Sequence, residues 1–367
     1  MGDMMDAVPV TELEELEKHL DDLTEKPDTP IDAELFDRVE LQLTEANIPN
    51  IMPRLLPKLA SILKVYQLDP LVLCSLALKL LQATSFTQIF TITSEADIVE
   101  ALRSPAASAN TLAMAILGKA SASPSEVSIL AASTLLVTEF LKCWLSAPQV
   151  EVGERGVHAL TDLLETDCEL PPVTLPLASG LPRTDLMRRR VPGHGSLWRR
   201  LFMDRDMFKL LVDLCEGTPF DGDVKQRSLA QGRILRVIPR LAVIHFSALT
   251  RSYHPDLLPR PNARAAGASP DSFLHYVTVR MVDLDDYLMR LSLVDYIETL
   301  VCAGRIAQHS PYTEEVLRGL LRELAALDPT LTRTLESLPE RVAEDEAEKM
   351  KGWINKLIPQ PPNVVVE

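Results

Sequence analysis

The chain has 367 residues, of which 46% are apolar and 24% are charged, and its formal net charge is −15. This length exceeds that of one ordinary compact domain, so we expect either two domains or an elongated architecture without a single central core. The acidic balance disfavours a general nucleic-acid-binding protein. The sequence contains no unbroken run of eighteen apolar residues, which disfavours a membrane-spanning helix.

The negative charge is concentrated near the N-terminus. Residues 1–45 contain fifteen acidic side chains against Lys18, Lys26 and Arg38, a net charge of −12. Such a surface repels phosphate groups, and it is either a solvated face or a face that suits a basic protein partner. The first residues carry acids where a secretion signal carries basic and apolar blocks, so we expect no secretion signal.

Apolar residues recur at helical spacing along almost the whole chain, without an alternating strand pattern of five or more residues. Capping residues followed by proline mark several helix starts, as at Ser123-Pro124 and Asp69-Pro70. The sequence therefore predicts an all-α protein. The expected helices are 10–26, 31–45, 50–66, 69–83, 85–92, 94–103, 106–120, 124–147, 150–166, 196–203, 205–217, 223–239, 241–251, 271–281, 283–303, 312–326, 329–344 and 346–358.

These short helices are joined by turns and pair into about nine antiparallel hairpins, at roughly the forty-residue spacing of HEAT and armadillo repeats. The pattern predicts a curved HEAT/armadillo-like helical-repeat solenoid, in which hairpins stack in file and leave a concave face free for binding. A compact helical bundle, or two bundles, is the alternative.

Two segments rich in proline interrupt the helical pattern, at 167–195 and 254–271. Loops of this length and composition are usually functional or disordered. We therefore predict four regions: N-terminal helical repeats over 1–166, a crossing loop rich in Pro, Gly and Arg over 167–195, C-terminal helical repeats over 196–358, and a tail over 359–367.

The cysteines stand far apart, without paired spacing, and three of them lie in apolar helical runs. This distribution predicts buried, reduced thiols rather than disulfides or a metal site. We accordingly expect a cytoplasmic protein, with the nucleus as a second compartment. The five positions are Cys74, Cys143, Cys168, Cys215 and Cys302.

No motif for catalysis or cofactor binding is found in the sequence. Gly118-Lys119 lacks the earlier glycine of a phosphate-binding loop and lies in a predicted helix, so it is a chance match. The seven histidines include no pair spaced four residues apart and no cysteine companions at ligand spacing. Asp283, Asp285 and Asp286 precede a helix, where carboxylates usually cap rather than catalyse. We predict a protein that is not an enzyme and that holds no metal or cofactor.

Residues 183–205 form a basic cluster, with seven arginines against Asp185 and Asp204. The arginines could bind nucleic acid, form ion pairs within the chain or with a partner, or belong to a solvated loop. Nucleic acid requires basic residues on a broad face with stacking aromatics, whereas Trp198 and Phe202 lie one helical turn apart and are expected in the core. Because a guanidinium donates two hydrogen bonds to one carboxylate, we favour ion pairing.

Four segments carry a recognisable order of motifs: 153-GERGVHALTDLLETD-167, 195-GSLWRRLFMDRD-206, 231-QGRILRVIPRLAVIHFSALTRSYHP-255 and 279-VRMVDLDDYLMRLSLVDYIETL-300. They resemble the fungal branch of the proteasome regulatory-particle assembly chaperones, the proteasome non-ATPase subunit 5 family, whose yeast member was first named for a mismatch-repair phenotype. The order of motifs extends over roughly residues 10–350, and the most specific are GxLWRRLFxDRD and QGRxL…IPRLA…TRSxHP.

The resemblance implies a curved solenoid without catalytic activity. Members of the family clasp the C-terminal domain of one ATPase subunit of the proteasome base and leave when the mature particle forms. We expect no small-molecule substrate and no membrane as partner, and the acidic balance of the chain disfavours nucleic acid. Members usually extend well beyond the length of this chain, so we expect distal repeats to lie outside this sequence. An armadillo-type transport or scaffold adaptor and a DNA-repair-associated binding factor are the alternative functions.

The motif positions supply the candidate site residues. We expect Trp198 and Phe202 to be core residues and Asp204 to cap the helix that follows it. Arg233 and Arg240 lie seven residues apart on one helix face, which permits a stripe either of inter-repeat ion pairs or of partner contacts. The candidate partner-binding residues are Arg199, Arg200, Arg205, Arg233, Arg240 and Arg251.

Overall fold

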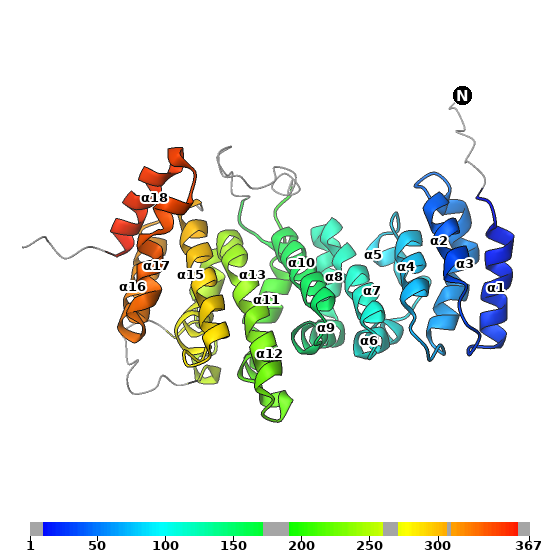
Figure 1. Cartoon of the computed structure of the whole chain (residues 1–367), viewed down its shortest axis with the longest axis horizontal. Coiled ribbons are helices and arrows are strands. Elements are labelled where there is room, and N and C mark those ends of the chain that lie inside the picture. Colours follow the sequence, from blue (N-terminus) through cyan, green and yellow to red (C-terminus); the bar gives the residue numbers. More distant parts are fainter. Residues whose placement is uncertain (1–9, 172–190, 260–270, 307–309, 359–367) are drawn as a thin grey trace, which may run out of the picture. The chain divides into compact units, whose positions relative to one another are not determined.

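The computed structural model describes residues 10–171, 191–259, 271–306 and 310–358 (Figure 1). All regular structure within these ranges is helical, with eighteen α-helices, several short 3-10 and π segments, and no strand. The predicted all-α fold of stacked helical repeats is confirmed, whereas the predicted curvature stays a prediction.

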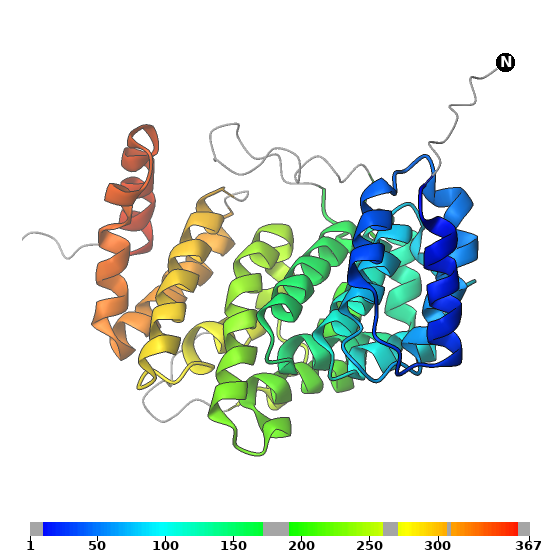
Figure 2. The same cartoon turned by 45° about the vertical axis from the view of Figure 1, so that its right-hand side comes forward.

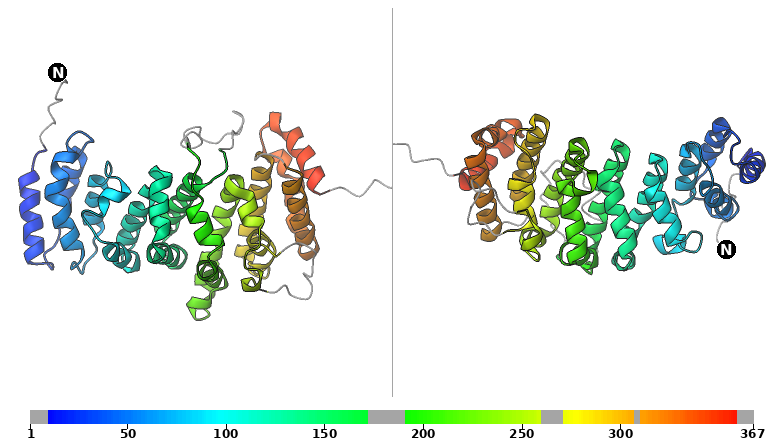
Figure 3. Two further views of the ribbon diagram at one scale, coloured as in Figure 1. Left: turned by 180° about the vertical axis from the view of Figure 1, so that it is seen from behind. Right: turned by 90° about the horizontal axis from the view of Figure 1, so that it is seen from below.

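The first compact unit, called unit 1, is Met1–Leu163, and its described helices follow one another in chain order from the blue α1 (Figures 1 and 3). Helix α1 packs on α3, α2 on α4, α4 on α7 and α6 on α9, which is the arrangement expected when successive hairpins stack in file. The helices are α1 (Leu13–Glu25), α2 (Ala33–Gln42), α3 (Ile48–Leu63), α4 (Leu71–Leu80), α5 (Phe86–Ile89), α6 (Glu95–Arg103), α7 (Ala107–Gly118), α8 (Pro124–Ala132), α9 (Thr134–Ser146) and α10 (Val150–Asp167), whose last residues belong to the second unit.

Polar residues fix where the helices of unit 1 begin. The hydroxyl of Ser123 accepts a hydrogen bond from the backbone N–H of Glu126 at 3.3 Å. The carboxylate of Asp69 accepts one from the N–H of Leu71 at 3.0 Å. Each bond satisfies a helix donor that has no partner inside the helix. The start signals predicted at both positions are thereby confirmed.

The core of unit 1 is built from apolar stripes at helical spacing. On α1, the fully buried Leu16, Leu20 and Leu23 share one face and turn toward α3, where Leu55 and Leu59 are also fully buried. Each such leucine stabilises the fold by roughly 1.5–3 kcal/mol through removal from water. The acidic residues of α1 therefore lie on its remaining faces.

The second compact unit, called unit 2, is Leu164–Glu367. Its helices follow in chain order from the green α11 to the red α18 (Figure 2). Helix α13 lies along α15, and α16 packs on α17 and α18. The helices are α11 (Ser196–Phe202), α12 (Arg205–Glu216), α13 (Val224–Thr250), α14 (Phe273–His275), the π-helical segment η4 (Tyr276–Arg280), α15 (Tyr287–Ile306), α16 (Pro311–Leu327), α17 (Pro329–Glu336) and α18 (Glu344–Leu357).

One predicted helix is two. The apolar run 124–147 breaks at Ser133, whose hydroxyl accepts a hydrogen bond from the N–H of Leu136 at 3.1 Å and so begins α9. An isolated serine within an apolar run was too weak a signal to place this cap from the sequence. Within the described residues no single helix is long and apolar enough to cross a membrane, although α8 and α9 together, bent by 91°, pass by length and composition alone.

The break between two predicted helices lies later than expected, because α13 continues through Pro239. A proline inside a helix removes one hydrogen bond, so the sequence predicts two helices there, 223–239 and 241–251. In the structure Pro239 is buried within α13, and the backbone instead departs from helical geometry at His245, with φ −153° and ψ 70°. Packing on both sides of the proline outweighs the lost bond.

Several boundaries also differ from the prediction. The helix expected over 271–281 is the single turn α14 followed by η4, and the helix expected over 329–344 ends at Glu336. Of the predicted crossing loop, residues 172–190 lie outside the described residues, as do 260–270 and the tail 359–367. The four predicted regions stay a prediction.

Candidate interaction surface

The end of α10 fixes the start of α11. Asp167 is fully buried, and its carboxylate accepts hydrogen bonds from the backbone N–H groups of Ser196, Leu197 and Trp198 at 3.0, 2.7 and 3.2 Å. These donors have no partner inside the helix, and the carboxylate also meets the positive end of the helix dipole. Burial raises the pKa of Asp167, and the three N–H donors oppose that rise.

The two glycines before α11 allow this close approach. The N–H of Gly193 donates to the carbonyl of Cys168 at 2.8 Å, and the N–H of Gly195 donates to the carbonyl of Asp167 at 2.7 Å. Gly195 has a left-handed φ of 63°, and a Cβ there would lie 2.6 Å from a carboxylate oxygen of Glu169. A Cβ on Gly193 would lie 2.0 Å from the backbone of Asp167. Both positions therefore require glycine.

Trp198 joins three elements of unit 2. Its indole is 4% exposed, and Nε1 donates to the carbonyl of Leu164 at 2.8 Å. The ring stacks on Phe202, with centroids 5.7 Å apart, and lies 5.1 Å from the ring of His245 on α13. Phe202 in turn meets Phe273 of α14 at 5.6 Å. The two aromatic residues of the motif are therefore core residues of unit 2.

Asp204 begins α12. One carboxylate oxygen accepts hydrogen bonds from the N–H groups of Asp206 and Met207, both at 3.1 Å. The other pairs with Arg200 at 2.8 Å. Asp204 thus caps one helix while it holds a cation from the preceding one.

The exposed arginines of the same motif also bond within unit 2. A guanidinium nitrogen of Arg199 lies 2.5 Å from Glu169, and another donates to the carbonyl of His194. Arg205 makes a two-pronged ion pair with Asp256, with nitrogen to oxygen distances of 3.1 and 2.5 Å. These contacts join α11 and α12 to the segments on either side of them.

The other three candidate arginines, two on α13 and one just beyond it, differ in their surroundings. Arg233 is only 8% exposed. Arg240 pairs with Glu165 of α10 at 3.1 Å. Arg251, just beyond α13, is exposed and has no ion-pair partner within the described part of the chain. The structure therefore does not bring the six candidate arginines together on one surface, and their role in partner binding stays a prediction.

Unit 2 retains an exposed apolar surface on α15. Tyr287 and Leu288 are 69% and 72% exposed, and Leu291, one turn further, is 45% exposed. We call these three residues the α15 patch. Asp286 caps the helix, accepting hydrogen bonds from the N–H groups of Leu288 and Met289 at 3.0 and 3.2 Å. Neighbouring exposed apolar side chains of this size are typical of a protein-binding surface.

Helix α13, which packs on α15, contains a glycine, Gly232, that no packing contact requires. Gln231 of α13 donates to the carbonyls of Cys215 and Met281 at 3.0 and 2.8 Å, which ties α13 to the segment before α15. At the next position, a Cβ added to Gly232 would meet no atom within 4 Å. Glycine within a helix costs about 1 kcal/mol relative to alanine, and no contact in the described fold requires it here. Its absent side chain leaves room for a partner to approach α13 closely.

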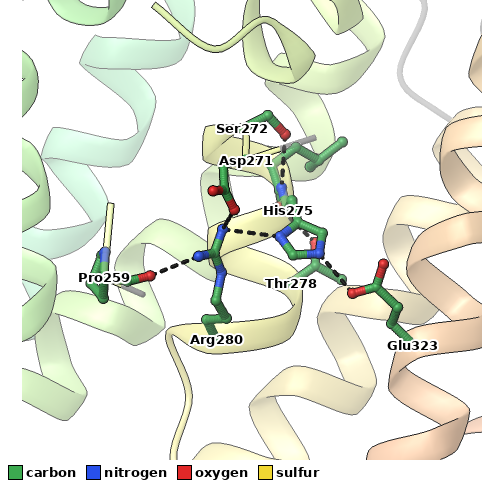
Figure 4. A network of polar contacts seen from close by, with 8 residues as sticks. Pro259, Asp271, Ser272, His275, Thr278, Arg280 and Glu323 are labelled. Carbon is green, nitrogen blue, oxygen red and sulfur yellow. Dashed lines mark hydrogen bonds and ion pairs between the residues drawn. The ribbon is translucent and has the colours of Figure 1, made fainter. Parts of the chain in front are cut away.

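A polar network joins α14 and η4 to α16 and to the segment before α14 (Figure 4). Arg280 donates to the carbonyl of Pro259 and to the carboxylate of Asp271, both at 2.7 Å, and to Nδ1 of His275 at 3.1 Å. Nε2 of His275 lies 2.8 Å from a carboxylate oxygen of Glu323 on α16. Since a guanidinium can only donate, Nδ1 accepts, and the imidazole proton is on Nε2 and points at Glu323.

Sequence reasoning missed this network. His275 and Arg280 lie five residues apart in the chain, and Glu323 follows 48 residues after the histidine. No spacing rule connects a lone histidine to a carboxylate two helices later. Pro259 and Asp271 both accept hydrogen bonds from Arg280, and only the tertiary fold brings them to it. Across the described ranges, no group of three or more His, Cys, Asp or Glu side chains is placed to hold a metal ion.

Comparison with known proteins gives a family match for the N-terminal part of the chain. Residues 11–151 match the family described as "DNA mismatch repair protein HSM3, N terminal domain". The match lies within unit 1, so the motif around Trp198 is outside it. No curated protein matches the chain in sequence.

Proposed function

We propose that this protein is a non-enzymatic assembly chaperone of the proteasome regulatory-particle base, because residues 11–151 match the N-terminal domain described for the HSM3 family. The family match is the observation that carries the proposal, and it joins the resemblance of the later motifs to proteasome assembly chaperones. The fold of stacked helical repeats supports it, since such folds bind other proteins over long surfaces.

The proposed partner is the C-terminal domain of one ATPase subunit of the base. The α15 patch of Tyr287, Leu288 and Leu291 offers exposed apolar anchors that a partner would remove from water, and the space beside Gly232 lets a partner approach the neighbouring helix. A few such anchors usually supply most of the binding free energy, with charged groups at the rim setting specificity. Exposed Arg251 is a candidate rim charge.

The test is a pull-down with the separated C-terminal domains of the six base ATPases. The expected result is capture of one domain in clear preference to the other five. Leu288→Asp should reduce that capture at least tenfold, because it places a charge among the anchors. Leu41→Asp is the matched control, since Leu41 on α2 is 86% exposed and lies outside the proposed surface. Equal capture of all six domains, or of none, would count against the proposal.

An association with DNA repair is the second candidate, since the description of the matched family names DNA mismatch repair. The net charge of −15 opposes direct binding to duplex DNA. Four of the candidate arginines, Arg199, Arg200, Arg205 and Arg240, form ion pairs within the chain. A gel shift at low salt tests it: steeply salt-dependent binding would favour a repair factor, and no shift at micromolar protein would exclude direct DNA binding.

We place the proposed activity in the cytoplasm, with the nucleus as a second compartment. All five cysteines are free thiols, and four of them are buried, Cys302 being partly exposed. An armadillo-type transport or scaffold adaptor would bind instead through ladders of Trp and Asn. The three tryptophans of this chain, Trp144, Trp198 and Trp353, are not periodic and are buried, which favours the chaperone.

A further inference from the structure

Unit 1 contains an open cavity of about 500 Å³ between α3, α4, α6 and α7. Its floor is aliphatic and buried, with Leu59 and Ala113 fully covered and Ile98 almost so. The cavity reaches solvent beside the turn between α3 and α4, where Leu68 is 54% exposed. Volumes of this size are typical of sites that hold a ligand or several side chains of a partner.

Small side chains keep this space open. Helix packing normally leaves no void larger than a water molecule, and leucines at the lining positions would fill most of the gap between the four helices. The alanines that line the cavity instead are Ala60, Ala77, Ala101, Ala106, Ala109 and Ala113. They come from α3, α4, α6 and α7 and the turn before α7, so the opening is a property of the whole arrangement and not of one residue.

The turn at the mouth of the cavity exposes apolar side chains beside the polar Lys64 and Gln67. Val65, Leu68 and Leu71 all lie at the turn between α3 and α4, and each is about half exposed or more. Turns between helices are normally polar because they run over the surface. Of these three, Leu68 also lines the cavity, so at this side chain the exposed apolar surface meets the apolar floor.

One carboxylate that lines the cavity has no basic partner in the described part of the chain. Both basic side chains that line the cavity are already paired: Lys64 with Asp97 at 2.9 Å and Arg103 with Glu139 at 2.8 Å. Glu100, which also lines the cavity, is exposed and has no cationic partner among the described residues. A cation brought by a partner would therefore find a carboxylate that is not already neutralised.

The net charge of unit 1 as a whole is also negative. Residues 1–163 contain twenty-four acidic and eleven basic side chains, a net charge of −13, so nearly all of the excess negative charge of the chain lies in this unit. Such a field attracts basic partners and repels acidic ones before contact is made. An acidic or phosphorylated segment is excluded as the occupant on the same ground.

We propose that this cavity is a docking groove for a basic, amphipathic segment of another protein. Large aliphatic or aromatic side chains of the segment enter the space between α4 and α7, and its lysines or arginines face Glu100 and the acidic surface of unit 1. The groove is a second binding site, distinct from the α15 patch in unit 2, and it does not depend on which protein binds that patch.

The probes are three synthetic labelled peptides that differ in one property each. The first carries leucines on one helix face and lysines on the other, the second has glutamine in place of each lysine, and the third has serine in place of each leucine. Binding to the full chain is followed by fluorescence anisotropy at low and at physiological salt. The first peptide should bind saturably, and each of the others at least tenfold more weakly at low salt.

Two variants locate the site. Ala60→Leu combined with Ala109→Leu fills the groove from α3 and α7, and should weaken binding of the first peptide at least tenfold. Ala115→Leu is the matched control, because Ala115 lies on α7 with similar exposure but does not line the groove. Thermal melting establishes that each variant folds. Glu100→Lys, an exposed substitution that leaves the packing unchanged, should weaken binding three- to tenfold, and by less at high salt.

Several results would overturn the proposal. One is the absence of saturable binding by the first peptide. Another is that the folded groove-filling variant binds the first peptide as tightly as the unmodified chain does. A third is that the serine peptide binds as tightly as the first peptide, which would show that charge alone explains the binding. Equal binding of the glutamine peptide at low salt would refute a basic partner. The groove-filling variant should still capture an ATPase C-terminal domain, since that domain is expected to bind unit 2. Failure of the groove proposal and failure of the proposed function can therefore be told apart.

Discussion

Replacing Trp198 with alanine removes the side chain that joins α10, α11 and α13 in unit 2. Truncation of a buried aromatic residue costs about 3–5 kcal/mol. Part of this cost is the hydrogen bond to the carbonyl of Leu164 at 2.8 Å, which leaves a buried acceptor without its donor. Trp198→Phe keeps an aromatic ring against Phe202 but loses that bond, so we expect it to cost about 1–2 kcal/mol.

Urea denaturation followed by far-ultraviolet circular dichroism measures both values, since it does not depend on tryptophan fluorescence. The transition of unit 2 should move to lower urea, while that of unit 1 should stay in place. Tyr287→Ala is the matched control, because that ring is exposed and its removal should change the stability by less than about 0.5 kcal/mol. A loss below about 1 kcal/mol for Trp198→Ala would refute the structural role given to the motif.

Four further predictions concern single side chains. Asp167→Ala should destabilise unit 2 by about 1–3 kcal/mol, since three helix donors lose their acceptor, and an unchanged melting temperature would contradict the cap. Arg103 lowers the pKa of Glu139 from its ordinary 4.5 to about 2, so the stability from this pair is present above pH 4.5 and is lost as the pH falls through about 2. Urea titrations at pH 5 and at pH 2.5 measure how much unfolding free energy each protein loses on acidification. Glu139→Gln should lose about 2–3 kcal/mol less than the unmodified chain, and equal losses in the two proteins would refute the role of this pair. Gly232→Ala should raise stability by about 0.5–1 kcal/mol in a thermal melt yet weaken partner capture, whereas a destabilised variant would mean that the fold itself needs the glycine. Arg280→Met leaves His275 and Asp271 without their donor and should cost about 3–5 kcal/mol of unfolding free energy, and a neutral result would show the network to be dispensable.

Local signals in the sequence were sufficient for the helices and many of their caps. Ser123 before a proline and Asp69 before another predicted helix starts that the side-chain hydrogen bonds confirm. These signals succeed because a cap and the helix it begins are adjacent in the chain. Ser133 and Pro239 misled the boundaries because tertiary packing decided whether the backbone broke, and that packing is not encoded in neighbouring residues.

The contacts that position the candidate surfaces could not be predicted, because they join residues far apart in sequence. Asp167 caps a helix that begins 29 residues later, and Glu323 reaches a histidine 48 residues earlier. The cavity in unit 1 depends on alanines contributed by four helices, each of them unremarkable within its own helix. The α15 patch was hidden for a related reason, since Leu288 fits a helical apolar pattern whether it is buried or exposed.

We propose that this chain binds one folded partner, the C-terminal domain of a single base ATPase. Isothermal titration calorimetry of the full chain against each of the six isolated ATPase C-terminal domains tests it most directly. We expect one domain to bind with at least tenfold higher affinity than the rest, and Leu288→Asp to abolish that preference. Six indistinguishable affinities, or no measurable heat with any domain, would contradict the account.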